Sequence, residues 1–248
     1  MSVEAAVGWI HVMLDLPAES AEPVTPFWAD ALGWPLGEPW PGHPEFTSFT
    51  PPTGDAYVHR QLGDHGPRVH LDLEVADPAA ARERLASLGA DVGSAHPHWQ
   101  VMSSPGGLPF CIVRRRSRSR PDPLAWGDGH RTRLVQVCVD SPAGRHEAEV
   151  AFWRAATGWR WVPGDAPEFA GKLYGAAGSP IQLLFQRLGG DDPGSSTRVH
   201  LDLGSDDIGA DADRLVSLGA QLIGPGDGWI ALRDPAGLSF CTTGNSPG

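Results

Sequence analysis

Cysteine is scarce in this sequence, and the few cysteines present do not form a disulfide or zinc pattern. The three cysteines, Cys111, Cys138 and Cys241, cannot all pair within one chain, and none belongs to a CxxC motif. The opening residues MSVEAAVGWIHVMLDLP have no positive segment ahead of an apolar core, so they do not resemble a signal peptide. We therefore expect a cytoplasmic protein with reduced thiols.

Long apolar runs and excess positive charge are also missing. No stretch is long and apolar enough to predict a membrane-spanning helix. The net charge of -11 argues against a nucleic-acid or anionic membrane partner, since phosphate binding needs a concentrated basic face. The sequence has no Ser-His-Asp order, no phosphate-binding glycine loop and no dinucleotide fingerprint, so nothing in it supports a hydrolase, kinase or dehydrogenase.

What the sequence does contain is an internal duplication. Three segments recur at one spacing of 130 residues: RVHLDL at Arg68 and Arg198, RLASLGA at Arg84 and RLVSLGA at Arg214, and SPGGLPFC at Ser104 and DPAGLSFC at Asp234. FWADALGW also returns as FWRAATGW at a slightly shorter spacing, because loops tolerate changes of length. We predict two copies of one domain, at residues 1–115 and 131–246. The basic, proline-containing residues 116–130 are interpreted as a solvated linker.

Each copy repeats one order of secondary structure. WIHVMLDL and RLVQVCVD have strand patterns, and the segments after them carry apolar residues at helical spacing. Asp77 and Pro78 predict the start of a helix that Gly89 ends, with its twin at about 207–218. Short β-rich runs separated by Pro and Gly follow. The order β-α-β-β-β is thus expected four times, in an α+β fold.

The repeated segments RVHLDL, RLxSLGA and DPAGLSFC, together with this module order, resemble the vicinal-oxygen-chelate superfamily, which includes glyoxalase I, bleomycin-resistance proteins and extradiol dioxygenases. The resemblance covers nearly the whole chain except the linker. It implies two open-barrel glyoxalase-like domains. It also implies one divalent metal ion, with Zn, Ni, Fe or Mn as candidates, held by residues of the first and last strands of paired modules.

The resemblance places His11 and His70 face to face as metal ligands in the first copy. Cys111 stands where metal-binding relatives usually have Glu. In the strand AYVHRQL, Tyr57 lies nearest another usual Glu position, and His59, one inward step along, is expected to complete a three-histidine metal set. Because the carboxylates are missing, we assign His59 and Tyr57 as the candidate catalytic residues.

The second copy has fewer chemical groups at the corresponding positions. Gln136, His200 and Cys241 align with the first-copy positions, and Leu183 and Phe185 replace its tyrosine and histidine. We expect this second pocket to be structural or to bind a ligand through apolar contacts.

Several residues are assigned to ligand binding. Aromatic walls suit flat organic molecules. The candidates are Trp40, Trp99, Gln136, His200 and Trp229.

Packing is an alternative explanation for three repeated pairs of residues. Strand histidines are commonly hydrogen-bonded core residues, thiols commonly fill small core spaces, and the aspartates are interpreted as outward-facing or capping. The pairs are His70 with His200, Cys111 with Cys241, and Asp72 with Asp202.

We therefore expect a protein that binds a small organic ligand near His11, His59 and His70. With a metal, the superfamily implies lyase, isomerase or dioxygenase chemistry. The alternative is metal-free sequestration of an apolar or aromatic compound, as in bleomycin-resistance proteins. The chain is expected to be a monomer with two pseudo-symmetric domains or a homodimer.

Overall fold

Four β-α-β-β-β modules follow one another in the computed structural model, which describes residues 6–192 and 194–248. The first module contains β1 (Val7–Leu16), α1 (Ala18–Leu32), β2 (Leu36–Trp40), β3 (His43–Phe49) and β4 (Val58–Leu62). The second contains β5 (Arg68–Val75), α2 (Pro78–Ser87), β6 (Asp91–Ala95), β7 (Trp99–Ser103) and β8 (Pro109–Arg114). The α+β fold and the repeated module order are confirmed in this first copy.

The second copy repeats the order. After the short β9 (Leu124–Ala125), the third module contains β10 (Arg131–Ser141), α3 (His146–Thr157), β11 (Arg160–Pro163), β12 (Phe169–Tyr174) and β13 (Gln182–Arg187). The fourth contains β14 (Arg198–Ser205), α4 (Ile208–Ser217), β15 (Gln221–Gly226), β16 (Trp229–Arg233) and β17 (Ser239–Thr243).

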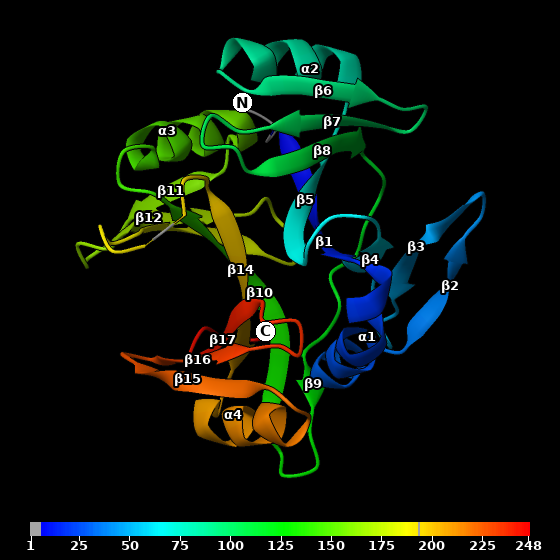
Figure 1. Ribbon diagram of the computed structural model, residues 1–248, viewed down its shortest axis with the longest axis vertical. Coiled ribbons are helices and arrows are strands. Elements are labelled where there is room, and N and C mark those ends of the chain that lie inside the picture. The colour runs from blue at the N-terminus through cyan, green and yellow to red at the C-terminus, as the bar shows by residue number, and fades with distance from the viewer. Residues whose placement is uncertain (1–5, 193) are drawn as a thin grey trace. The chain divides into compact units, whose positions relative to one another are not determined.

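Each copy forms one sheet, and the two sheets have the same strand order (Figure 1). The first runs β2-β3-β4-β1-β5-β8-β7-β6, and the second runs β11-β12-β13-β10-β14-β17-β16-β15, with β9 added beside β10. The first strands of paired modules, β1 with β5 and β10 with β14, join at the centre of each sheet. Both sheets are open among the described residues, in agreement with the open barrels expected from the sequence.

Two compact units can be distinguished, and neither coincides with one copy. Within the described residues, the first unit contains 6–12, 70–118 and 137–199, and the second contains 13–69, 119–136 and 200–248. Each unit therefore combines most of a module from the first copy with most of a module from the second.

The core of the first unit joins the second and third modules. Phe110 of β8 packs against Phe152 and Trp153 of α3, with ring centroids 5.9 and 5.5 Å away. Glu149 accepts hydrogen bonds from Trp153 Nε1 at 2.8 Å and from the backbone N of Gly106 at 2.7 Å. The carboxylate thus satisfies a buried indole N–H that would otherwise be unpaired.

The core of the second unit repeats this arrangement with the first and fourth modules. Phe240 of β17 packs against Phe27 and Trp28 of α1, at 5.7 and 5.2 Å. Asp234 accepts the hydrogen bond from Trp28 Nε1 at 2.9 Å. The Phe-Trp pair of each copy therefore packs on a strand of the other copy.

The helix beginning at Asp77 is confirmed. The Asp77 side chain accepts hydrogen bonds from the backbone N of Ala79 and Ala80, and Pro78 occupies the first helical position. Asp207 caps α4 in the same way. Sequence alone identifies such caps because they depend on a few adjacent residues.

The segment between the copies, interpreted from the sequence as a solvated connector, makes specific contacts with both copies. Arg118 forms hydrogen bonds to the buried Glu74. The backbone N of Ser119 donates to Asp55 at 2.7 Å, and β9 pairs with β10. The domain limits 1–115 and 131–246 stay a prediction.

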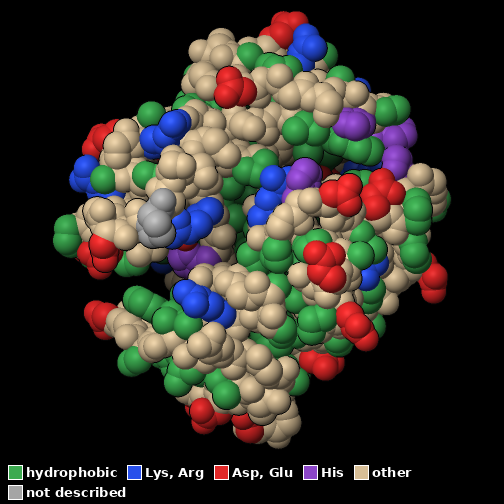
Figure 2. Space-filling model, viewed as in Figure 1, with side chains coloured by type: hydrophobic (Ala, Val, Ile, Leu, Met, Phe, Trp, Pro, Cys, Tyr) green, Lys and Arg blue, Asp and Glu red, His purple; other side chains and the backbone are tan. Residues whose placement is uncertain are grey.

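Charged side chains of both signs are scattered over the face shown in Figure 2. Among the described residues, no helix combines the length and apolarity required to cross a membrane. The absence of a nucleic-acid or membrane partner stays a prediction.

Candidate metal-binding site

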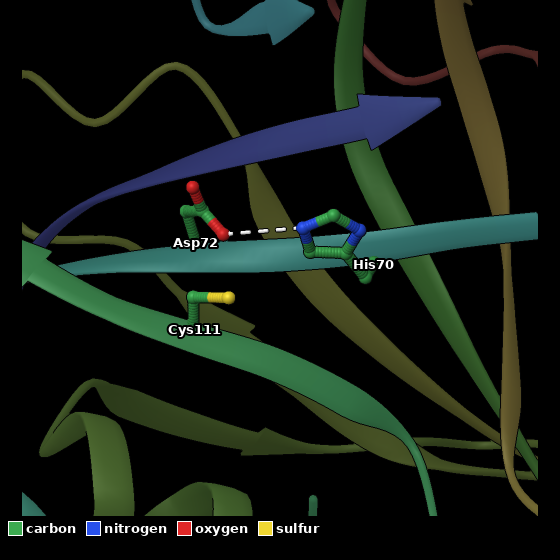
Figure 3. A group of neighbouring side chains, drawn as sticks. All are labelled: His70, Asp72 and Cys111. Carbon is green, nitrogen blue, oxygen red and sulfur yellow. Dashed lines mark ion pairs between the residues drawn. The ribbon is translucent and has the colours of Figure 1, made fainter. Parts of the chain in front are cut away.

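A cluster of metal-ligating side chains lies where β5 runs parallel to β8. Because alternate residues of a strand face the same side, His70 and Asp72 lie on one face of β5. Asp72 pairs with Cys111 of β8 in the strand register. The pairing of the two strands therefore places an imidazole, a carboxylate and a thiol next to one another (Figure 3).

The three ligand atoms of this cluster all lie within 4.8 Å of one another. His70 Nε2 is 3.4 Å from Asp72 Oδ1, and the two side chains are 9% and 14% exposed. Asp72 Oδ1 is buried and makes no hydrogen bond within the described part of the chain. A buried carboxylate oxygen without a hydrogen bond is unfavourable unless a cation neutralises it.

Cys111 is a buried free cysteine, and its burial favours the neutral thiol. Burial raises the pKa of Cys111 to about 11; the neighbouring His70 opposes this shift, and Asp72 adds to it. A thiolate at this position therefore requires a positive charge close by.

The second copy contains the same three residue types in the same arrangement. His200 Nε2 is 3.4 Å from Asp202 Oδ1, and Asp202 pairs with Cys241 across β14 and β17. The ligand atoms of the three residues also lie within 4.8 Å of one another. Gln136 of β10 donates a hydrogen bond from Nε2 to Asp202 Oδ2.

The aspartates are where the sequence interpretation failed. Asp72 and Asp202 were expected to face outward or to cap, but both lie beside a histidine on a regular strand. The signal that identifies them is the two-residue spacing in RVHLDL, present in both copies.

Close to the first cluster, His11 belongs to a network of charged groups. Its Nε2 lies 3.0 Å from Glu74 Oε1, and Glu74 also accepts hydrogen bonds from the Arg118 guanidinium at 2.9 and 2.7 Å and from the backbone N of Arg116 at 2.9 Å. Burial raises the pKa of Glu74, but the hydrogen bonds from His11, Arg116 and Arg118 outweigh it and lower the pKa to about 2. Glu74 follows Asp72 on the same face of β5, and sequence reasoning overlooked it.

His59, the third histidine of the expected metal set, belongs to the second unit, whereas His11 and His70 belong to the first. His59 Nδ1 lies 2.8 Å from Ser48 Oγ, and the ring meets Trp40 edge-on at 5.3 Å. The clusters described above include neither His11 nor His59. A metal site shared by the three histidines stays a prediction.

Tyr57 is fully buried just before β4. Its hydroxyl donates to the carbonyl oxygen of Leu134, and its ring packs edge-on against Trp34 at 5.3 Å. Burial raises the pKa of Tyr57, which makes proton loss unfavourable. A catalytic role for Tyr57 stays a prediction that this geometry does not favour.

The candidate ligand-binding tryptophans pack against neighbours in their own units. Trp40 stacks on Phe46 at 5.2 Å and donates to Ser48 Oγ. Trp99 stacks on His96 at 4.5 Å, and Trp229 pairs with Gly226 across β15 and β16. Contact between these indoles and a ligand stays a prediction.

A family model described as a glyoxalase-like domain matches the chain twice, over residues 11–113 and 136–243. These two matches include most of the sequence. The chain belongs to the glyoxalase-like family. This glyoxalase-like protein is thus a two-domain member of the vicinal-oxygen-chelate superfamily, as the repeated segments indicated. Comparison with curated protein sequences finds no match.

Solved structures support the fold of the glyoxalase-like protein. The Mn(II)-bound glyoxalase from Novosphingobium aromaticivorans is 22% identical, with a TM-score of 0.64 over 96% of this chain and 82% of the other. A triple mutant of 4-hydroxymandelate synthase from Streptomyces coelicolor is 18% identical, with a TM-score of 0.61 over 98% and 94%. The 2,3-dioxygenase LapB from Pseudomonas sp. KL28 is 13% identical, with a TM-score of 0.60 over 97% and 93%. At these identities the likeness shows the fold alone.

Proposed function

We propose that this glyoxalase-like protein binds a divalent cation at His70, Asp72 and Cys111, and binds a small organic ligand with oxygen donors at that cation. The single observation that carries the proposal is the position of Asp72 Oδ1. It is buried, has no hydrogen bond in the described chain, and lies 3.4 Å from His70 Nε2.

The separation of these two atoms fits a pair of metal ligands better than a hydrogen bond. An N–H···O hydrogen bond spans about 2.7–3.2 Å. Two ligands that each lie about 2.1 Å from a tetrahedral ion are about 3.4 Å from each other. Three protein ligands also leave a position for water or substrate, as in catalytic zinc sites.

The donor set supports a zinc-like ion over manganese. Imidazole and thiolate ligands favour Zn²⁺ and other borderline ions, whereas Mn²⁺ prefers oxygen ligands. Cys111 therefore suggests a different ion from that of the Mn(II)-bound glyoxalase. When bound, such an ion polarises a ligand oxygen and lowers the pKa of a bound water.

The other residues near the cluster favour proton transfer as the reaction. Glu74, fixed by Arg118, orients His11 through its Nε2. His11 is thus the candidate general base, and proton transfer favours a lyase or isomerase reaction over dioxygenation.

Cobalt binding tests the proposal, because cobalt bound to a thiolate has a charge-transfer absorption. The full chain, purified without an affinity tag and stripped with a chelator, is titrated with Co²⁺ and Zn²⁺. We expect Cys111→Ser to remove a thiolate-cobalt absorption and His70→Ala to remove one bound ion. His96→Ala is the matched control, because His96 stacks on Trp99 outside the cluster. Metal binding that is unchanged in both Cys111→Ser and His70→Ala would contradict the proposal.

A metal-free ligand-binding protein is the second candidate, because burial raises the pKa of the Cys111 thiol and so favours its protonated form when no cation is bound. Without a cation, the cluster presents a protonated thiol beside the His70–Asp72 pair. Fluorescence titration of the chelator-treated protein with an aromatic probe distinguishes the two functions. Equal probe affinity with and without Zn²⁺ favours the metal-free function.

A further inference from the structure

We propose that the chain holds a second divalent cation, at His200, Asp202 and Cys241, so that one molecule binds two. This inference rests on the proposed function for the kind of ion, but its residues are separate and lie in the second unit. It departs from the expectation that the second pocket has only a structural or apolar role.

The second cluster has the geometry of the first. The distance from the histidine Nε2 to the aspartate Oδ1 is 3.4 Å in both, and both pair the aspartate with the cysteine across parallel strands. Asp202 Oδ1 is buried without a hydrogen bond in the described chain, and its side chain is 2% exposed. Burying the charge of Asp202 is therefore costlier than burying that of Asp72, whose side chain is 14% exposed.

A feature found only in the second cluster strengthens the inference. Gln136 donates a hydrogen bond to Asp202 Oδ2, which fixes the carboxylate with Oδ1 toward His200. Hydrogen bonds of this kind orient metal ligands and raise metal affinity. Gln136 is therefore a positioning residue for the second site. In the first copy, His11 occupies the position of Gln136 but contacts Glu74 instead of the cluster aspartate. The second copy has Gly204 at the position of Glu74, so it lacks this contact.

The two clusters can be tested independently by counting ions. The full chain is loaded with Co²⁺, and bound ions are counted by native mass spectrometry in the wild type, Cys111→Ser, Cys241→Ser and the double variant. We expect two, one, one and none, with the thiolate-cobalt absorption falling in each single variant. Asp202→Asn replaces Cys241→Ser if that variant does not fold.

The other outcomes separate this inference from the proposed function. One ion that only Cys111→Ser removes overturns the second site and leaves the proposed function standing. One ion that only Cys241→Ser removes supports the second site and overturns the first. No bound ion overturns both.

Gln136→Leu distinguishes a residue that positions a metal ligand from one that only stabilises the fold. We expect it to weaken cobalt binding at the second site about 10–100-fold and to leave the first site unchanged. Equal weakening at both sites, or none at either, would contradict the positioning role.

Discussion

Glu74 is the most heavily bonded carboxylate near the first cluster. Its partners are His11, the backbone N of Arg116 and the side chain of Arg118. Removing one partner from a buried charge leaves part of its desolvation penalty uncompensated. Between the two copies, Arg118 therefore stabilises the Glu74 carboxylate most, because its side chain donates two hydrogen bonds to it.

Arg118→Ala is expected to lower the free energy of unfolding by about 1–3 kcal/mol, because Glu74 loses two charge-assisted hydrogen bonds. Urea denaturation measures the change. Arg116→Ala is the matched control, since Arg116 contacts Glu74 through its backbone N. Equal destabilisation by the two variants would show that the loss of one positive charge, and not the loss of the side-chain contact with Glu74, is responsible.

Glu149 predicts a pH dependence of stability. Burial raises its pKa, although bonds from Ser104, Trp153 and Gly106 oppose the shift. A folded-state pKa above the unfolded value means that the folded state binds the proton more tightly, so this contribution to stability falls as pH rises from 4.5 through the folded pKa.

The measurement is the difference in unfolding free energy between wild type and Glu149→Gln, followed by urea denaturation from pH 4 upward. The variant also loses the hydrogen bond from Gly106, which changes the difference in unfolding free energy by the same amount at every pH. The test is therefore how this difference changes with pH. We expect the wild type to lose stability relative to the variant as pH rises. A difference that does not change with pH would refute a raised pKa.

At the scale of elements, helix caps and strand periods were predictable because they involve neighbouring residues. The cap at Asp77 was expected, and Asp207 repeats it in α4. The two-residue period of β5 also fixed which residues share a face, but sequence alone did not show that β5 is regular there or that β8 lies beside it.

Asp77→Ala and Asp207→Ala are each expected to lower the unfolding free energy by about 1 kcal/mol, because each removes acceptors from the first turn of a helix. Asp77→Asn should retain most of the stability, since asparagine also caps. Asp91→Ala, at an exposed position on β6, is the control for charge. Comparable effects of Asp91→Ala and Asp77→Ala in urea denaturation would rule out capping as the cause.

At the scale of the whole molecule, each copy supplies part of the core of the other. Phe152 and Trp153 pack on Phe110, and Phe27 and Trp28 pack on Phe240. A single copy would leave its Phe-Trp pair exposed, and the first copy alone would also leave the Trp28 indole N–H without Asp234.

Cutting the chain after Pro123 tests this dependence. We expect neither fragment alone to unfold cooperatively, and the mixture of the two to recover a cooperative transition by circular dichroism. Each fragment alone should also bind a fluorescent hydrophobic probe more strongly than the intact chain does. A sharp thermal transition in either isolated fragment would show that its copy folds independently.

The sequence by itself determined the duplication, the four β-α-β-β-β modules and the caps, because each depends on residues close together along the chain. It also brought His70 to notice as a candidate ligand. Only the tertiary structure decided that Asp72 and Cys111 accompany His70, and that Arg118 reaches Glu74. These contacts depend on which distant strands and segments become neighbours, which local periodicity does not specify.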